Sequence, residues 1–224
     1  MNNMVIAIDG PAASGKGTLA RKIAERLGCA YLDTGALYRS VAKRVLDLGQ
    51  NPADAQNAEK AALWLQQNVT PDLLADPAIR TDEVSVAAAK IADFPAVRQG
   101  LFDLQRNFAQ NPPKPAKGAV LDGRDIGTII CPDADVKLYV TAEAEIRAQR
   151  RLKELQSQGI AATYEAVLKD MRERDARDAG RKAAPMKPAE DAIILDSSTL
   201  GPEQALEKAL AVIAERLTAR KTNA

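Results

Sequence analysis

The stretch that decides the fold is Gly10-Pro11-Ala12-Ala13-Ser14-Gly15-Lys16-Gly17-Thr18. It follows a short apolar run at residues 5–8 and opens a segment, residues 16–27, whose apolar side chains recur at helical spacing. In the pattern G-x-x-x-x-G-K, glycines let backbone N–H groups surround a phosphate, and the helix N-terminus adds positive charge. Because strand, loop and helix follow in the required order, we interpret residues 10–18 as a phosphate-binding loop and not as an ordinary glycine turn.

The same loop predicts where ATP and its magnesium ion are held. Lys16 is expected to bridge the β- and γ-phosphates. Gly17 stands where many such loops carry Ser or Thr, so we expect Thr18 to supply the hydroxyl for Mg²⁺, directly or through water. Asp122 closes an apolar run at residues 119–121 and is the second candidate ligand for the metal or its waters. The alternative is that Asp122 only caps a turn.

Five short apolar runs separated by helical stretches predict the fold class. The runs are residues 5–8, 30–32, 119–121, 136–140 and 192–195. Alternation of strand and helix favours a parallel sheet, in which ligands lie at the carboxyl ends of the strands. We therefore predict an α/β fold of the P-loop NTPase type, with a five-stranded parallel sheet flanked by helices.

Two segments interrupt the alternation. Residues 34–118 are helical in pattern but broken by prolines, and they end in a proline-rich connector at residues 111–118, so we predict an inserted subdomain. Residues 143–181 contain two helical stretches, at 143–156 and 164–179, and are rich in arginine, which predicts a lid. Residues 1–33, 119–142 and 182–224 remain as the P-loop core.

Composition excludes several classes of function. The 31 basic and 30 acidic residues nearly cancel, which removes the electrostatic argument for a nucleic-acid binder. No apolar run is long enough to span a bilayer, and the two cysteines lack the spacing of a zinc site or disulfide scaffold. There is no histidine, so histidine-assisted nucleophilic catalysis is excluded. We expect a cytoplasmic monomer that binds small phosphorylated molecules, with no nucleic acid or membrane as partner.

Further motifs, in order along the chain, resemble those of bacterial cytidylate kinases, and the resemblance covers nearly the whole sequence. They are Leu32-Asp33-Thr34-Gly35-Ala36-Leu37-Tyr38-Arg39, Ile79-Arg80-Thr81-Asp82-Glu83-Val84, Phe94-Pro95-Ala96-Val97-Arg98, Asp122-Gly123-Arg124-Asp125-Ile126-Gly127, and Glu173-Arg174-Asp175-Ala176-Arg177-Asp178 with Arg181. The resemblance implies transfer of the γ-phosphoryl group of ATP to CMP or dCMP, with Mg²⁺ as cofactor and residues 34–118 holding the acceptor nucleotide.

The resemblance also implies a role for each matching residue. Lys16, Arg124, Arg174 and Arg181 are the candidate catalytic cations, which agrees with the need of phosphoryl transfer for cationic stabilisation. The implied acceptor site is Thr34, Arg39, Arg98, Arg124, Asp125, Asp178 and Arg181. Of these, Arg98 and Asp125 are expected to read cytosine, Asp178 to serve the sugar or the geometry of the lid, and the others the phosphate or sugar.

Some residues keep alternative interpretations. Arg174, Arg177 and Arg181 have spacings that would also suit ion pairs on an exposed helix. The arginines at positions 147, 150 and 151 reach ATP or form a solvated helix face, and we leave them out of the site. Ala89 stands where relatives often carry a serine that assists cytosine binding; Ser85, one turn away, is the candidate substitute.

Two competing functions stand beside the cytidylate kinase hypothesis. One is a different small P-loop kinase, acting on AMP, UMP or a metabolite alcohol, whose acceptor motifs should differ from these. The other is a regulator that binds ATP as a switch, which the arginine-rich segment disfavours. The insert is also shorter than in the longer members of the family, which predicts a less enclosed acceptor pocket.

Lys16 provides the first test. Lys16→Ala should lower kcat by orders of magnitude while the protein stays folded, because a lysine at this place stabilises charge chiefly in the transition state. Steady-state kinetics together with circular dichroism measure both quantities. A folded variant that keeps more than about a tenth of the wild-type kcat contradicts this role.

Overall fold

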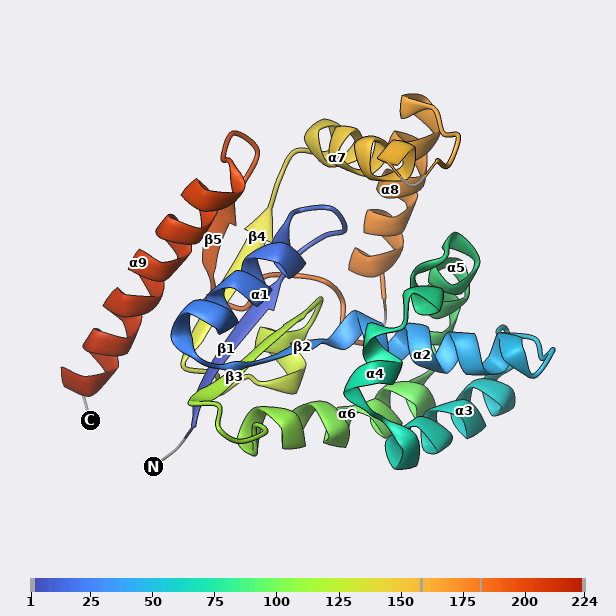
Figure 1. Ribbon diagram of the computed structural model, residues 1–224, viewed down its shortest axis with the longest axis horizontal. Coiled ribbons are helices and arrows are strands. Elements are labelled where there is room, and N and C mark those ends of the chain that lie inside the picture. Colours follow the sequence, from blue (N-terminus) through green and yellow to red (C-terminus); the bar gives the residue numbers. More distant parts are fainter. Residues whose placement is uncertain (1–2, 158, 182, 223–224) are drawn as a thin grey trace. The chain divides into compact units, whose positions relative to one another are not determined.

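The computed structural model describes residues 3–157, 159–181 and 183–222 (Figure 1). Residues 1, 2, 158, 182, 223 and 224, which fall inside the core and lid ranges predicted above, lie outside the described residues. The chain forms two compact units. The sheet unit contains the residues up to Leu32 and those from Ala109 onward, and the helical unit contains Asp33–Phe108.

Within the described ranges, five strands form one sheet in the order β2-β3-β1-β4-β5. They are β1 Met4–Asp9, β2 Ala30–Asp33, β3 Gly118–Gly123, β4 Val136–Thr141 and β5 Ile193–Asp196. β1 pairs in parallel with β3 and β4, and β4 pairs in parallel with β5. The predicted parallel sheet flanked by helices is confirmed. Asp9 of β1 lies level with Gly123 of β3, so the carboxyl ends of neighbouring strands meet at one edge.

The described helical segments of the sheet unit are α1 Lys16–Leu27, the π-helical turn η2 Ile126–Ile130, α7 Ala144–Ser157, α8 Tyr164–Ala179 and α9 Pro202–Thr222. α1 has the predicted bounds because its apolar spacing ends at Gly28, whose left-handed backbone lets its N–H bond back to the carbonyls of Ala24 and Glu25. No helix in the described part of the chain is both long and apolar enough to cross a membrane.

A core cluster fastens α1 and α9 to the sheet. Leu19 and Ile23 of α1 pack with Ile6 and Ile8 of β1, and Ile213 of α9 joins the same cluster. Ile6, Ile8 and Ile23 are completely buried, and burying such a side chain contributes about 1.5–3 kcal/mol. Strand β1 and helix α1 are therefore fixed to each other, and the loop between them is held at both ends.

The helical unit is built from α2 Thr34–Asp47, α3 Ala55–Asn68, α4 Pro71–Ala75, the short 3₁₀ segment η1 Pro77–Arg80, α5 Asp82–Ile91 and α6 Pro95–Gln110. Three of the prolines that interrupt the pattern, Pro71, Pro77 and Pro95, are first residues of these segments. A proline costs nothing there because the first N–H of a helix has no partner within it. The predicted breaks thus mark where helices begin.

Gly10 lies very close to the backbone of a neighbouring strand. It has a φ of 145°, and a Cβ added to it would lie 2.0 Å from the carbonyl oxygen of Val140 in the neighbouring strand β4. Only a residue without a side chain lets β1 turn into the phosphate-binding loop this close to β4.

Gly10→Ala should therefore reduce the free energy of unfolding by at least about 2 kcal/mol, because it adds both a backbone clash and an unfavourable φ. Urea denaturation measures the change. Gly100→Ala in α6 is the matched control: its Cβ would have 3.4 Å to the nearest atom, a side-chain nitrogen of Gln66, and alanine favours a helix. Equal effects of the two substitutions would contradict the role of the close approach.

Candidate functional site

The phosphate-binding loop lies between the end of β1 and the start of α1. Ala13 and Gly15 have left-handed backbones, with φ of 56° and 85°, and Ser14 between them is completely buried. No side chain caps the N-terminus of α1 at Gly15. A helix start of this kind directs its backbone N–H groups and its dipole at a bound anion, which is the geometry that a phosphate requires.

Asp122 lies directly beside this loop. Its Oδ1 accepts a hydrogen bond of 3.0 Å from the hydroxyl of Tyr31 on β2, and the residue is 5% exposed. A Cβ placed on Gly17 would have 3.4 Å to the other carboxylate oxygen, Oδ2. Asp122 thus occupies the space into which a Ser or Thr side chain at position 17 would extend, while Thr18 is exposed.

The surroundings of Asp122 fit a magnesium ion that arrives with a nucleotide. Among the described residues there is no group of three or more Asp, Glu, Cys or His side chains that could hold a metal by themselves. Mg²⁺ at kinase sites typically takes one or two protein oxygens and completes its shell with phosphate and water. A carboxylate next to the phosphate-binding loop supplies the charged oxygen that this arrangement requires.

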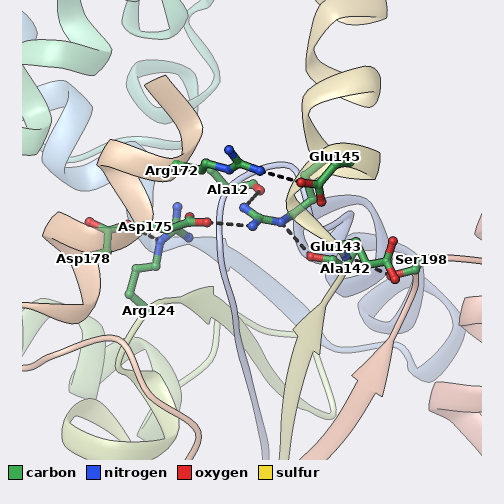
Figure 2. Close-up of polar contacts among 10 residues, drawn as sticks. Ala12, Arg124, Ala142, Glu143, Glu145, Arg172, Asp175, Asp178 and Ser198 are labelled. Carbon is green, nitrogen blue, oxygen red and sulfur yellow. Dashed lines mark hydrogen bonds and ion pairs between the residues drawn. The ribbon is translucent and has the colours of Figure 1, made fainter. Parts of the chain in front are cut away.

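A buried group of opposite charges joins β3 to the end of α8. Nε of Arg124 donates to Asp178 at 3.0 Å, and Nη2 of Arg181 lies 2.6 Å from the same carboxylate (Figure 2 draws the Arg124 contact). Asp178 is 3% exposed. Burial alone would raise the pKa of Asp178, but the charges of Arg124 and Arg181, with a further contribution from Arg174, hold it below the ordinary value. The structure therefore brings together three of the predicted site residues, Arg124, Asp178 and Arg181.

Arg147 of α7 contacts three different segments. Its guanidinium donates to the carbonyl oxygen of Ala142 at 2.8 Å, to that of Ala12 in the phosphate-binding loop at 3.3 Å, and to Asp175 of α8 at 2.7 Å. Figure 2 labels the three residues that accept these hydrogen bonds, Ala12, Ala142 and Asp175. Arg147 is 5% exposed. The interpretation of Arg147 as part of a solvated helix face is wrong, because all three acceptors draw the side chain inward.

A second arginine of α7 reaches the loop through a serine. Arg150 donates to the carbonyl oxygen of Ser197 at 2.6 Å and to its Oγ at 3.0 Å. The Ser197 hydroxyl in turn donates to the carbonyl oxygen of Ser14 at 2.9 Å. Carbonyls of the loop are thus held by partners on α7 and after β5, which leaves the opposite, N–H side of the loop for an anion.

Asp125 directly precedes η2 and is 7% exposed. The two N–H groups that follow it, those of Ile126 and Gly127, both donate to the carboxylate of Asp9 at 2.8 Å. Burial raises the pKa of Asp9 to about 7, although the two hydrogen bonds act in the opposite direction. Asp9 is a residue that the sequence interpretation passed over, although a carboxylate at the end of an apolar strand was a visible signal.

The remaining predicted residues belong to the helical unit. Asp33 caps α2 by accepting from the N–H of Ala36, and it pairs with Arg39 at 2.7 Å and Arg80 at 3.3 Å. Nε of Arg39 is buried and makes no hydrogen bond to any described residue. Thr34 is 4% exposed.

Arg98 has its own setting on α6. It donates to the carbonyl oxygen of Ala92 at 3.4 Å, and its guanidinium lies 5.9 Å from the centre of the Tyr38 ring. The helical unit therefore holds Thr34, Arg39 and Arg98, whereas the sheet unit holds the other predicted residues. Ser85 and Ala89 are both half-buried on α5.

Known proteins of one family are similar to this chain over nearly its whole length. The family model described as "Cytidylate kinase" matches residues 6–215. A cytidylate kinase of Paramagnetospirillum magneticum is 55% identical over 212 residues, which cover 95% of this chain and 98% of that protein. One from Rhodospirillum rubrum is 54% identical over 213 residues, with the same coverage of 95% and 98%.

Solved structures share the fold at low identity. A gluconokinase from Sinorhizobium meliloti is 14% identical with a TM-score of 0.53, covering 99% of this chain and 98% of its own. At this identity the likeness concerns the fold alone. The family model and the relatives, in contrast, match nearly the whole chain, and so this protein belongs to the cytidylate kinase family.

Proposed function

We propose that this chain transfers the γ-phosphoryl group of ATP to CMP or dCMP, giving ADP and CDP or dCDP. The observation that carries the proposal is the Arg124–Asp178–Arg181 group, which lies in the same compact unit as the phosphate-binding loop. Phosphoryl transfer depends on positioning and on cations that stabilise the oxygens of the transferred group. A family member with a phosphate loop and buried guanidinium groups supplies both.

The absence of histidine is consistent with this chemistry. The attacking atom is an oxygen of the acceptor's phosphate monoester, whose second pKa of about 6 leaves it ionised at neutral pH. No general base is needed to remove a proton. The chain's task is to align this oxygen with the γ-phosphorus and to neutralise the charge that gathers between two phosphates.

ATP binds along Gly10 to Thr18, with Lys16 at its β- and γ-phosphates. Asp122 and Thr18 would hold the Mg²⁺ that accompanies ATP, directly or through water, and the ion would supply positive charge to the phosphate oxygens. The hydrogen bond from Tyr31 fixes the carboxylate of Asp122 against the loop. Arg147 and the Arg150–Ser197 pair bind carbonyl oxygens of the loop, so the N–H groups of the loop stay oriented toward the phosphates.

Arg124, Arg174 and Arg181 are the cations for the transferred group. Before substrate binds, Asp178 holds Arg124 and Arg181, which keeps two guanidinium groups together in a buried setting. An arriving phosphate can take over these donors because it carries more charge than one carboxylate and accepts bidentate hydrogen bonds. Asp178 then serves the geometry of the lid and the sugar of the acceptor.

Residues 143–181 act as a lid over the reacting phosphates. The proposal is supported by a small apolar cluster that α7 and α8 share, built on Ala148, Leu155 and Val167, separate from the main core. A helix pair with its own cluster can keep its internal packing while the contacts of Arg147 with the loop and of Arg150 with Ser197 break and form again. We assign residues 1–33, 119–142 and 182–224 to the P-loop core and residues 34–118 to the acceptor-binding insert.

The acceptor's base is read by Arg98 and Asp125, and its phosphate or sugar by Thr34 and Arg39 together with Arg124 and Arg181. The buried Nε of Arg39, which has no hydrogen-bond partner among the described residues, is a donor suited to a phosphate oxygen. Cytosine presents an N4 amine donor and the N3 and O2 acceptors, so one carboxylate and one cation suit it. A monomeric state and a cytoplasmic location remain our predictions, because both substrates are small molecules and nothing in the composition points elsewhere.

A coupled assay with ATP and CMP, dCMP, UMP, AMP or GMP, each offered separately, tests the proposed reaction. Turnover should be fastest with CMP or dCMP. Failure to turn over any of the five acceptors would overturn the kinase proposal, and a preference for AMP or GMP would favour a different acceptor class.

Asp178→Asn should lower the free energy of unfolding by about 2–4 kcal/mol at neutral pH, because it removes the charge that Arg124 and Arg181 share. The pKa of Asp178 is lowered in the folded protein, so this stability is present above the ordinary value near 3.8 and is lost as the pH falls through the lowered folded value.

Urea denaturation at pH ~7 and pH ~3 should therefore show the gap between wild type and Asp178→Asn closing at acid pH. Glu203→Gln is the control: its pair with Lys22 is exposed and should contribute little at either pH. If the difference in free energy of unfolding between wild type and Asp178→Asn is the same at both pH values, the charge of Asp178 does not stabilise the fold.

Asp125→Asn should narrow the CMP to UMP ratio of kcat/KM by ~10-fold or more. An amide offers both a donor and an acceptor, whereas the carboxylate rejects the carbonyl that uracil presents at position 4. Most of the change should be lost turnover of CMP. Kinetics with both substrates on the purified variant measure the ratio; if both fall alike, Asp125 only supports the fold.

A further inference from the structure

We propose that Asp9 is a positioning residue that fixes the segment carrying Arg124 and Asp125 to the base of the phosphate-binding loop, and that it contributes through Asp125 to the choice of cytosine. The inference rests on the proposed role of Asp125 in reading the base. Asp9 itself touches no reacting atom.

The carboxylate of Asp9 connects two functional segments. Asp9 is the last residue of β1 and precedes Gly10, the first residue of the loop. Its Oδ1 accepts from the N–H of Ile126 and its Oδ2 from the N–H of Gly127, both at 2.8 Å. Both oxygens are therefore used on the two residues that directly follow Asp125.

The backbone of Asp125 is held from both sides. Its own carbonyl oxygen accepts from the N–H groups of Ile129 and Ile130 at 2.9 and 3.2 Å, inside the turn η2. On the other side, Gly123 of β3 lies level with Asp9 in the sheet register. Five consecutive residues, Gly123 to Gly127, thus run past a single carboxylate that anchors their far end.

Burying the carboxylate of Asp9 is energetically unfavourable, which indicates that its place in the structure serves a purpose other than stability. Asp9 is 4% exposed, and burial opposes its charged form strongly enough to raise its pKa to about 7. A buried carboxylate is expensive to keep, because burial removes the water that stabilises its charge. The carboxylate of Asp9, however, holds the segment that contains Asp125 next to the phosphate-binding loop. It can thereby contribute to specificity, since a specificity contact displaced by an ångström loses most of its effect.

Close packing leaves the segment little freedom to shift. A Cβ added to Gly127 would lie 3.2 Å from Cδ of Lys137 and 3.4 Å from Oδ2 of Asp9. The side chain of Lys137 is itself held, with Nζ donating to the carbonyl oxygen of Pro132 at 2.6 Å and to Asp191 at 2.8 Å. Gly127 therefore sits between two fixed groups.

Asp9→Asn is the first test, because it keeps the shape of the side chain but turns one of its two acceptors into a donor that faces an N–H. We expect the CMP to UMP ratio of kcat/KM to narrow by ~5-fold or more, with the KM for ATP changed less than about 2-fold. Hydrogen exchange at the amides of Ile126 and Gly127 should speed up.

A double-mutant cycle separates this mechanism from general weakening. If Asp9 acts through Asp125, adding Asp9→Asn to Asp125→Asn should not narrow the ratio further. Asp135→Asn is the matched control, since Oδ2 of Asp135 accepts from the N–H of Val5 at 2.8 Å on the same strand β1. This control should lower stability and leave the ratio unchanged.

The outcomes distinguish two failures. An unchanged ratio in Asp9→Asn, with a narrowed ratio in Asp125→Asn, overturns the inference about Asp9. An unchanged ratio in Asp125→Asn overturns the proposed reading of the base instead. Should Asp9→Asn not fold, Gly127→Ala crowds the same segment against Lys137 and Asp9 while keeping the carboxylate, and it too must narrow the CMP to UMP ratio for the inference to stand.

Discussion

The packing of α1 on β1 is the interaction on which the rest of the structure depends. Ile23 against Ile6 and Ile8 sets the distance between the end of the strand and the start of the helix. A loop that must span this distance has few conformations available, and here it takes left-handed turns at Ala13 and Gly15. The apolar contacts between α1 and β1 therefore shape the anion site, although none of these side chains belongs to the loop. The parallel register brings Asp122 and the segment after β3 to the same edge of the sheet.

Much of the fold could be predicted from the sequence because the signals are local. α1 and α8 have the predicted bounds, since apolar spacing and flanking glycines define them. Strands β1 to β4 are one to three residues longer than the predicted apolar runs, and β5 is shifted by one residue. Two of the omitted residues, Asp9 and Asp33, are polar although they belong to β1 and β2. An apolar pattern cannot include a strand end that has been recruited for hydrogen bonding.

The site was predictable where a motif carries it and hidden where tertiary contacts do. Arg124, Asp178 and Arg181 were named from short motifs, and the structure brings them together. Asp9 and Tyr31 were not named, and Arg147 was left out of the site. Each makes a contact with a residue 91 to 135 positions away in the sequence, which no local spacing encodes. The partners of a buried polar side chain become visible only when the chain is folded.

The contacts of Arg147 also have a consequence for synthesis of the chain. The loop at Ala12 is made early, but the guanidinium that holds its carbonyl comes 135 residues later, and Asp175 later still. Contacts of such long range form after local helices and turns. A nascent chain that has emerged only as far as β3 contains the whole phosphate-binding motif yet lacks the groups that brace it. The loop therefore reaches its braced form only after α7, α8 and the segment after β5 have been made.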